Sequence, residues 1–390
     1  MHNDADVLII GGGPVGATLA LALRGSGVAV TVLEARSAGV ASNDQRTLAL
    51  SEGSRQILQR LGVWQALTPY VTTIATIHIS QRGRLGRSIM QAREQGQEAL
   101  GYVLPYAALA NVLDQKLAEC GVAQVLFDAR AVGLASTEYD AHVRYERDGA
   151  TQECRTRLAV VADGGRSLNE LPGMQRDVRE YGHCAVVGTV TSVLPHHNIA
   201  YERFTPEGPV ALLPSGEHGF ALVWTADPAE AEALIALDED AFLSRLHQHF
   251  GDRVGRFTSI ADRAAFPLKL ATLRPVTGPH LAVIGNAAQT LHPVAGQGFN
   301  LGLRDAWELA ATLRDVAPDA VGNPETLARY CARRRLDTGG GIFFTDFLVR
   351  SFSNDLPGLG TARGMALAAL DLMAPAKHFV ARKMSFGANG

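Results

Sequence analysis

The 390-residue chain has few cysteines, no long hydrophobic run and no block of one charge. Its four cysteines lie far apart and form no C-x-x-C pair, so we expect neither structural disulfides nor a cysteine zinc site, and this usage suits the cytoplasm. No apolar segment reaches the roughly 18 residues that a membrane-spanning helix needs. The cysteines are Cys120, Cys154, Cys184 and Cys331.

Other absences exclude further classes of protein. The formal net charge is -3 and basic residues form no block, so we expect no nucleic-acid partner. His247 and His249 are two apart on a predicted helix and point to different sides, which argues against a metal site. The apolar run near residue 8 follows Asp4 and Asp6 without a basic flank, so no signal peptide is expected. A length of 390 residues allows two or three domains, and 47% apolar with 19% charged residues is the composition of an ordinary globular protein.

The N-terminal segment predicts a strand, a glycine turn, a helix and a second strand. Val7–Ile10 reads as a buried strand, and Val28–Leu33 as the second, which Glu34 ends. A G-x-G-x-x-G turn between them lies 18 residues before this acid, the context of a dinucleotide site. The glycines permit a close approach of pyrophosphate to the backbone, and the acid can accept hydrogen bonds from ribose hydroxyls. The glycines are Gly11, Gly13 and Gly16.

A second glycine-rich stretch runs from Leu281 to Leu313. It begins as a strand, Leu281–Gly285, and ends as a helix with one apolar face. Gly296-Gln297-Gly298 lies between them, and Asn300 is expected to cap the helix. Such a loop lets a flat ligand lie against bare backbone, and the helix N-terminus can hold an anion or an electron-rich carbonyl.

Two further polar residues are candidates for the same site. Asp163 follows the predicted buried strand Leu158–Ala162 and precedes Gly164, a position suited to a nucleotide contact or to an ordinary turn. Arg46 follows the first unit and could reach a pyrophosphate or remain on the surface. The residues alone leave both alternatives open.

The middle of the chain changes character. Residues 183–271 read as a β-rich layer, and Ala229–Phe250 within them as one helix. Residues 73–100 predict a solvated hairpin, with a site for an anionic ligand or a membrane surface as the alternative, because arginines crowd a polar segment. These arginines are Arg82, Arg84, Arg87 and Arg93.

We predict an α/β fold in which a β-rich substrate layer interrupts a discontinuous nucleotide-binding domain. Residues 1–72, 101–182 and 272–336 form the nucleotide-binding domain, 73–100 and 183–271 the substrate domain, and 337–390 a helical C-terminal region. The apolar residues of this C-terminal region are expected to pack on the core or, alternatively, to form a surface for another subunit or a lipid bilayer.

Taken together, the stretches resemble a known family. GGGPVG with Glu34, the Asp163-Gly164 turn and GNAAQTLHPVAGQGFNLGLRD occur in the order seen in class A flavoprotein aromatic hydroxylases, which share the fold of p-hydroxybenzoate hydroxylase. YERF at Tyr201–Phe204 and GPVALLP at Gly208–Pro214 resemble the ubiquinone-biosynthesis branch. The similarity covers nearly the whole chain.

The resemblance implies roles for individual residues. The three glycines would take the FAD pyrophosphate and Glu34 the adenosine ribose, while Arg46 matches an arginine near the pyrophosphate. Asp163 matches an acid linked to FAD and the nicotinamide donor. Asn286 stands where the family commonly has Asp, and Tyr106 where many relatives have Arg or Gln. The residues expected to line the isoalloxazine are Pro293, Gly296, Gln297, Gly298 and Asn300.

The activity implied is hydroxylation of a polyprenylated phenol in ubiquinone biosynthesis, with FAD, NAD(P)H and O2, through a flavin C4a-hydroperoxide. His292, Pro293 and Tyr201 are the candidates for the reaction centre; packing roles are the alternative for His292 and Tyr201. Competing functions are hydroxylation of another aromatic compound and a structural flavoprotein of a biosynthetic complex. A halogenase is disfavoured because W-x-W-x-I is missing. We also expect that the chain can form a homo-oligomer and can contact a membrane peripherally through its C-terminal region.

Overall fold

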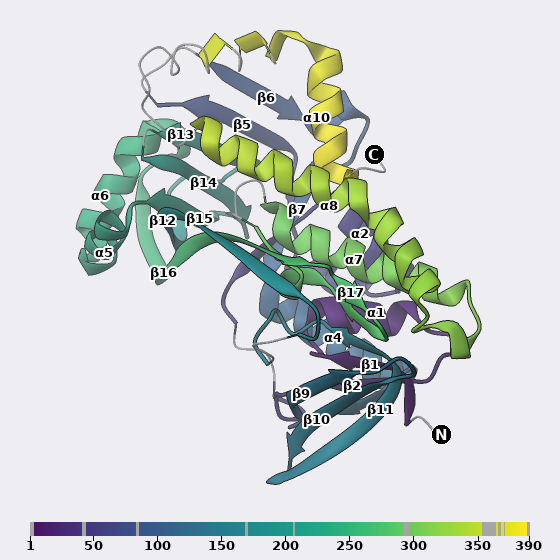
Figure 1. Cartoon of the computed structure of the whole chain (residues 1–390). Helices are drawn as coiled ribbons and strands as arrows, with labels where there is room; N and C mark the ends of the chain where they lie inside the picture. Colours follow the sequence, from purple (N-terminus) through teal and green to yellow (C-terminus); the bar gives the residue numbers. More distant parts are fainter. Residues whose placement is uncertain are drawn as a thin grey trace.

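In the computed structural model, the described residues form two eight-stranded sheets, one three-stranded sheet and the helices packed on them (Figure 1). The α/β class and the expected fold are confirmed by this architecture. The structure describes residues 4–40, 44–82, 86–167, 171–205, 207–291, 296–352, 364–365, 368–369 and 371–387, with the backbone alone for 348–352.

The first sheet forms the lower half of the molecule in Figure 1 and has the order β17-β18-β11-β1-β2-β8, with β9 and β10 extending it from β11. β1 pairs in parallel with both β11 and β2. Both faces of β1 are covered, since Val7 and Ile9 belong to one core and Leu8 and Ile10 to another, which explains its uninterrupted apolar sequence. The strands are β1 (Ala5–Ile10), β2 (Val30–Leu33), β8 (Gln124–Leu126), β9 (Arg130–Ser136), β10 (Ala141–Arg147), β11 (Ala150–Val161), β17 (Thr277–Gly278) and β18 (Leu281–Val283).

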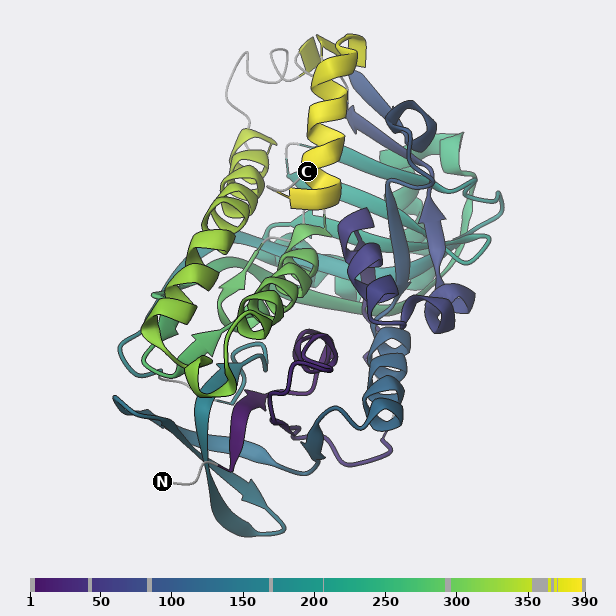
Figure 2. The same cartoon turned by 90° about the vertical axis from the view of Figure 1, so that its right-hand side faces the viewer.

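Helices cover one face of this sheet. α1 (Pro14–Ala22) packs against α4 (Tyr106–Cys120) and α7 (Gln297–Arg314), and α7 also contacts α8 (Pro324–Phe352). Figure 2 shows α7 and α8 running side by side. The strand–turn–helix–strand unit predicted for the N-terminus is confirmed.

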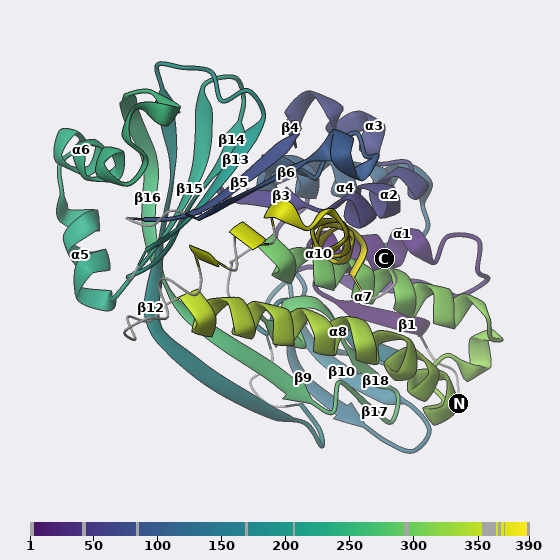
Figure 3. The ribbon, with the colours of Figure 1, turned by 90° about the horizontal axis from the view of Figure 1, so that it is seen from above.

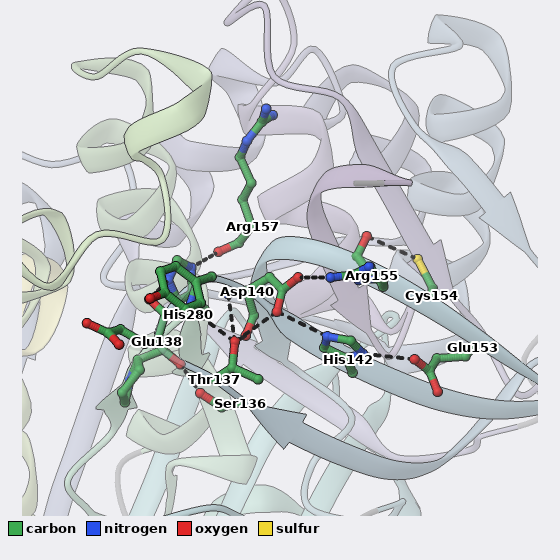
Figure 4. Close-up of polar contacts among 12 residues, drawn as sticks. Ser136, Thr137, Glu138, Asp140, His142, Glu153, Cys154, Arg155, Arg157 and His280 are labelled. Atoms are coloured by element: carbon green, nitrogen blue, oxygen red, sulfur yellow. Dashed lines mark hydrogen bonds and ion pairs between the residues drawn. The ribbon is translucent and has the colours of Figure 1, made fainter. Parts of the chain in front are cut away.

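A polar cluster holds the β9–β10–β11 meander together (Figure 4). The Asp140 carboxylate accepts a hydrogen bond from Arg155 at 2.8 Å and lies 3.0 Å from His142 Nε2, whose Nδ1 lies 2.8 Å from Glu153. The His280 ring bridges the Arg157 and Glu138 carbonyl oxygens at 2.6 and 3.0 Å. These contacts tie the outer strands to His280, the residue before β18.

The second sheet forms the β-rich layer, in the order β19-β16-β12-β15-β14-β13-β5-β6. All its neighbours are antiparallel except β13 and β5, which pair in parallel. Residues 73–100 thus supply β5 and β6 to the same sheet as residues 183–271, and the predicted hairpin is confirmed. The strands are β5 (Thr76–Gln81), β6 (Arg87–Gln91), β12 (Gln175–Ser192), β13 (Ile199–Thr205), β14 (Gly208–Ser215), β15 (Gly219–Ala226), β16 (Phe257–Arg274) and β19 (Gln289–Thr290).

The helix predicted over Ala229–Phe250 is wrong, because two helices occupy this segment, α5 (Pro228–Ala236) and α6 (Glu239–Phe250). The Asp238 carboxylate accepts a hydrogen bond from Ala241 N at 2.8 Å and caps α6, so local capping ends one helix and begins the next. Figure 3 shows both helices on one side of the second sheet and α7, α8 and α10 on the other.

The two layers are joined by continuous strands. β12 and β16 are 18 residues each, and the predicted domain boundaries at 182/183 and 271/272 fall inside them. A small sheet of β3 (Thr47–Leu50), β7 (Gly101–Pro105) and β4 (Thr72–Ile74) lies between the layers. Along the chain, α2 (Glu52–Arg60) and α3 (Trp64–Leu67) connect β3 to β4. Ile74 and Val103 of this small sheet pack on Ala200 of β13, so it contacts the inner face of the second sheet.

The described residues of the C-terminal region are mostly helical, as predicted, but α8 begins at Pro324, before the expected boundary at 337. α10 (Ala374–Phe386) lies beside β5 and β6 in Figure 1. Within the described ranges, no helix is both long and apolar enough to cross a bilayer.

Candidate active site

The three sequence motifs meet at the carboxyl ends of β1, β11 and β18, which are neighbouring parallel strands. Gly11 follows β1, Asp163 follows β11 and Gly285 follows β18. A Cβ on Gly11 would lie 2.6 Å from Asp163 Cα, so the first two turns touch through their backbones. Ligands of open α/β sheets bind at this edge.

The glycine turn leaves the N-terminus of α1 open. Gly11 has a φ of +103°, which side chains rarely adopt, and a Cβ on Gly16 would lie 2.0 Å from Gly11 O. Gly13 is the N-cap, and no side chain caps the helix. Unpaired amide groups at the start of a helix therefore face the turn, as a bound pyrophosphate requires.

A cavity of about 190 Å³ adjoins this turn and Glu34. Glu34 Oε1 accepts from Arg36 N at 2.8 Å, while Oε2 lies 2.8 Å from where a Cβ on Gly12 would be. Oε2 can therefore take a ribose hydroxyl beside the turn, and the cavity is suited to an adenine because its walls are largely apolar. The cavity is lined by Gly12, Val32, Glu34, Asp114, Leu117, Ala118, Gly121, Ala123, Val125 and Phe127.

Arg46 and Tyr106 lie together at the other side of the turn. The Arg46 guanidinium carbon is 5.0 Å from the centre of the Tyr106 ring, and Tyr106 Oη is 3.5 Å from where a Cβ on Gly13 would lie. Arg46 Nε also donates to the Asp44 carboxylate at 2.8 Å. The sequence left a polar contact at position 106 in doubt; the structure places a phenol there that the arginine stacks on.

The Asp163 carboxylate stabilises its own turn. It accepts hydrogen bonds from Gly165 N at 2.8 Å and Ser167 N at 2.6 Å. Asn286, by contrast, has an exposed side chain in the turn that follows β18. Asn286 is therefore accessible from outside the protein, whereas the Asp163 carboxylate is engaged by its own turn.

The predicted cap of α7 is wrong. The helix begins at Gln297, and Gly296 is its N-cap, in the left-handed conformation. The Asn300 amide donates to Ala49 O and Gly296 O at 2.9 and 2.7 Å, and its oxygen accepts from Ser51 N and Ser54 Oγ at 2.8 and 2.7 Å. Because all these contacts are within the protein, the Asn300 side chain is held by its neighbours and is not available to a ligand.

Of the three reaction-centre candidates, His292 and Pro293 lie outside the described residues. Tyr201 belongs to β13 and packs against Phe220 and Phe250 of the outer core, where burial raises the pKa of its phenol. Its ring lies on the α6 side of the sheet, away from the small β3–β7–β4 sheet. Its role at the reaction centre stays a prediction, and this packing does not favour it.

Glu202, the next residue along β13, lies on the opposite face of the sheet from Tyr201. Glu202 shares the inner face with Ala200, because side chains alternate along a strand. Its partners in register, Ile79 and Ala211, are apolar, and burial raises the pKa of the Glu202 carboxyl to about 7. Glu202 is not among the residues singled out from the sequence, although the YERF segment quoted there contains it. The available signal was that successive side chains of a strand lie on opposite faces, so Glu202 and Tyr201 face different sides of the sheet.

A buried ion network behind the site was also missed. Asp305 accepts from Gly285 N at 3.0 Å and from Arg334 Nε at 2.8 Å, and Arg304 donates to Asp337 at 2.7 Å. Arg334 also pairs with Asp337. The network fixes the turn after β18 on α7 and α8. It adds no metal site, and the described residues contain no group of His, Cys, Asp and Glu suited to one.

These features fit a bound FAD. The α1 turn and Arg46 would hold the pyrophosphate, the cavity beside Glu34 the adenosine, and the turn at Gly296 the ring system. An adenosine cavity, an open helix N-terminus and a second helix end at one sheet edge define an FAD-binding flavoprotein.

Comparison with known proteins agrees. The model of the FAD binding domain family matches residues 4–338, so the chain belongs to this family, and within it to the class A flavin hydroxylases of ubiquinone biosynthesis. The chain is 36% identical over 387 residues to ubiquinone hydroxylase UbiL of Rhodospirillum rubrum, covering 97% of this chain and 89% of the relative. It is 31% identical to 3-demethoxyubiquinol 3-hydroxylase of Escherichia coli, covering 95% of each.

A solved structure shows the same fold. The p-nitrophenol 4-monooxygenase PnpA of Pseudomonas putida superposes with a TM-score of 0.81 over 100% of both chains, at 17% identity. The protein is therefore an FAD-dependent aromatic-ring monooxygenase that uses O2, with NAD(P)H as the electron donor typical of the family.

Proposed function

We propose that this enzyme hydroxylates a polyprenylated phenol in ubiquinone biosynthesis, in the manner of 2-octaprenyl-6-methoxyphenol hydroxylase. The observation that carries the proposal is the similarity to ubiquinone hydroxylases along nearly the entire chain. The proposal also includes the way of activating O2 that the resemblance to the family implies. When bound, FAD supplies the redox chemistry, accepting hydride and activating O2 for transfer of a hydroxyl group.

The protein's part is to orient the ring system and to exclude water. The N-terminus of α7 presents backbone amides and the positive end of the helix dipole, which suits the negative charge of a reduced flavin. The turn at Gly296 contacts Ala49 of β3, which pairs with Val103 of β7. Val103 in turn packs on Ala200. This chain of contacts links the flavin turn to the inner face of the second sheet.

Glu202 lies on that face, two residues beyond Ala200 and so about 7 Å further along β13. No hydrogen-bond partner of its carboxylate occurs among the described residues. A phenol has an ordinary pKa of about 10 and is more reactive as phenolate. A carboxylate with a pKa near 7 suits a general base at neutral pH, so we assign Glu202 to accept the phenol proton.

Replacing Glu202 by Gln should remove this base while keeping the side chain's size. We expect kcat/KM for hydroxylation to fall about 10²-fold or more and the loss of activity below pH 7 to disappear from the pH profile. Substrate turnover from pH 5.5 to about 9 measures this, with the exposed Glu217→Gln as the control. A full pH limb near 7 in the Glu202→Gln enzyme would refute the assignment.

Stability gives an independent readout of the same carboxyl. Its folded pKa lies above the ordinary value of about 4.3, so its contribution to stability is present below that pH and is lost as the pH rises through 7. The Gln variant should therefore gain thermal stability relative to the wild type as the pH rises from 5 to 8.

The function is tested with purified enzyme, NAD(P)H and two phenol series, one prenylated and one short and soluble. We expect substrate-stimulated NAD(P)H oxidation with a hydroxylated product for the prenylated series alone. Turnover of short phenols only would favour a hydroxylase of another aromatic compound. Normal FAD binding without turnover of either would favour a structural role in a biosynthetic complex. The quinone intermediate that accumulates on gene deletion identifies the ring position.

The proposal includes a cytoplasmic enzyme that contacts the membrane peripherally, where a prenylated substrate resides. Large apolar side chains of the C-terminal region support it, since they are exposed on the surface. Leu372 is 86% exposed and Phe343 72%, and Lys383 lies nearby in sequence on α10. Self-association and membership of a ubiquinone-biosynthesis complex would use the same kind of surface.

A further inference from the structure

The arginine-rich segment around β5 and β6 leads to a cavity that the hydroxylation does not use. The cavity has a volume of about 700 Å³ and lies at the β6 edge of the second sheet, between η3 (Gly251–Val254) and the C-terminal region. It is lined by His78, Ser80, Gln81, Gly86, Arg87, Arg203, Arg253, Ala368, Asp371 and Leu372. Tertiary structure alone assembles this set, because β5, β13, η3 and the C-terminal region are distant in sequence.

Its positive charges are not balanced. Arg253 donates to the uncharged acceptor His78 Nε2 at 3.0 Å, and Arg203 Nε is buried without a partner among the described residues. Burial and the nearby Arg253 and Arg82 lower the pKa of the Arg203 guanidinium, the sign of cations crowded together. Burial, Arg253, Arg87 and Arg203 lower the pKa of His78.

The carboxylate that lines the cavity is bound mainly to other groups, although the charge of Arg87 helps to lower the pKa of the Asp371 carboxyl. Asp371 accepts a hydrogen bond from Ile89 N at 2.9 Å and pairs with Lys377 at 3.4 Å. Lys377 also donates to Ile89 O at 2.9 Å, so these two side chains fasten the C-terminal region to the edge of β6. Among the described residues, Arg87, Arg203 and Arg253 form no ion pair within 4 Å, and Asp371 is near enough to Arg87 only for a longer-range effect.

We propose that this cavity binds a phosphate ester whose charged group lies among Arg87, Arg203 and Arg253 and whose apolar part lies along Ala368 and Leu372. Guanidinium groups bind phosphate through two parallel hydrogen bonds, and three of them match the nearly two negative charges of a phosphomonoester. A single phosphate does not fill the volume, and two of the lining residues are apolar. A phospholipid headgroup and a small soluble phosphate ester share this chemistry. The proposal stands independently of the substrate proposed above.

The test uses the FAD-loaded full chain. Inorganic phosphate is titrated at constant ionic strength against chloride, with the thermal transition as readout, and co-sedimentation is measured with phosphatidylcholine vesicles with and without phosphatidic acid. We expect the wild type to be stabilised by phosphate or to sediment with the phosphatidic-acid vesicles. A response to phosphate in solution without vesicle binding identifies a soluble ester as the ligand. Vesicle binding without a response to phosphate identifies a lipid headgroup.

Arg203→Met is the diagnostic variant, and Arg93→Met is the control, because Arg93 belongs to the arginine-rich segment that supplies Arg87 but does not line the cavity. Arg203→Met should weaken anion binding about tenfold or more. Without anion it should unfold at the wild-type temperature or above, since it relieves repulsion. Arg93→Met should bind as the wild type does.

Two outcomes would overturn the proposal. One is a wild type that responds to neither probe. The other is an Arg203→Met chain that keeps wild-type anion binding. If Arg203 only stabilised the fold, Arg203→Met would lower the temperature of the thermal transition measured without anion. That measurement therefore distinguishes a structural defect from the loss of a ligand.

Discussion

Replacing Asp305 by Ala is expected to destabilise the protein by about 3–5 kcal/mol. Asp305 is 2% exposed, and its loss leaves the buried Arg334 with one carboxylate, Asp337, which Arg304 already shares. The buried network would then contain two arginines and one carboxylate, and water does not reach the interior to compensate the extra positive charge. Urea unfolding monitored by circular dichroism measures the change.

The control is Asp315→Ala, which removes an exposed ion pair with Arg333 (3.3 Å). Exposed pairs contribute about 0–1 kcal/mol, so this variant should unfold close to the wild type. Equal stabilities of the Asp305→Ala and Asp315→Ala proteins would contradict the role given to the buried network.

The same substitution should weaken FAD binding for a separate reason. Asp305 Oδ2 accepts from Gly285 N at 3.0 Å and from Gln289 Nε2 at 2.6 Å, and so holds the turn that carries Asn286. The double variant Asp305→Leu, Arg334→Met removes both charges and should recover part of the stability. It restores no acceptor for Gly285 N, so FAD affinity should stay low. Recovery of both together would show that the turn does not depend on Asp305.

Replacing Gly16 by Ala is the second change with a large expected effect. The new Cβ would lie 2.0 Å from Gly11 O and 3.2 Å from Ile9 Cγ2. A backbone oxygen at the end of β1 cannot move away without disturbing the turn next to Asp163. We expect a protein that purifies without FAD and with a lowered thermal transition, measured by flavin absorbance and calorimetry.

Substitutions at two further glycines distinguish a steric clash within the protein from the loss of ligand binding. Gly339 in α8 has no atom within 4 Å of the position of a Cβ, so Gly339→Ala should be neutral or stabilising by up to about 1 kcal/mol. A Cβ on Gly13 would meet nothing closer than Tyr106 Oη at 3.5 Å. Gly13→Ala should therefore fold normally and still weaken FAD, because the pyrophosphate loses its close approach. A Gly16→Ala protein with full FAD content and wild-type stability would contradict the geometry.

Local sequence predicted the elements that depend on near neighbours. The β1 turn, α1 and β2 follow from glycine spacing and apolar runs, and the β5–β6 hairpin from alternation. The prediction was wrong where two local signals competed. Asp238 lies within an apolar helical pattern but caps a new helix, and Asn300 resembles a cap but lies inside α7, which begins at Gly296 and Gln297.

The sequence by itself determined the nucleotide turn, its acid and the family of the enzyme, because these depend on short spacings that local backbone geometry enforces. Only the tertiary structure decided which face of β13 looks inward, and so that Glu202 rather than Tyr201 lines the inner side. It also brought together Asp305 with Arg334, and His78 with Arg253, 175 residues away. Strand pairing and helix packing set these contacts between distant segments, and no periodicity along the chain encodes them.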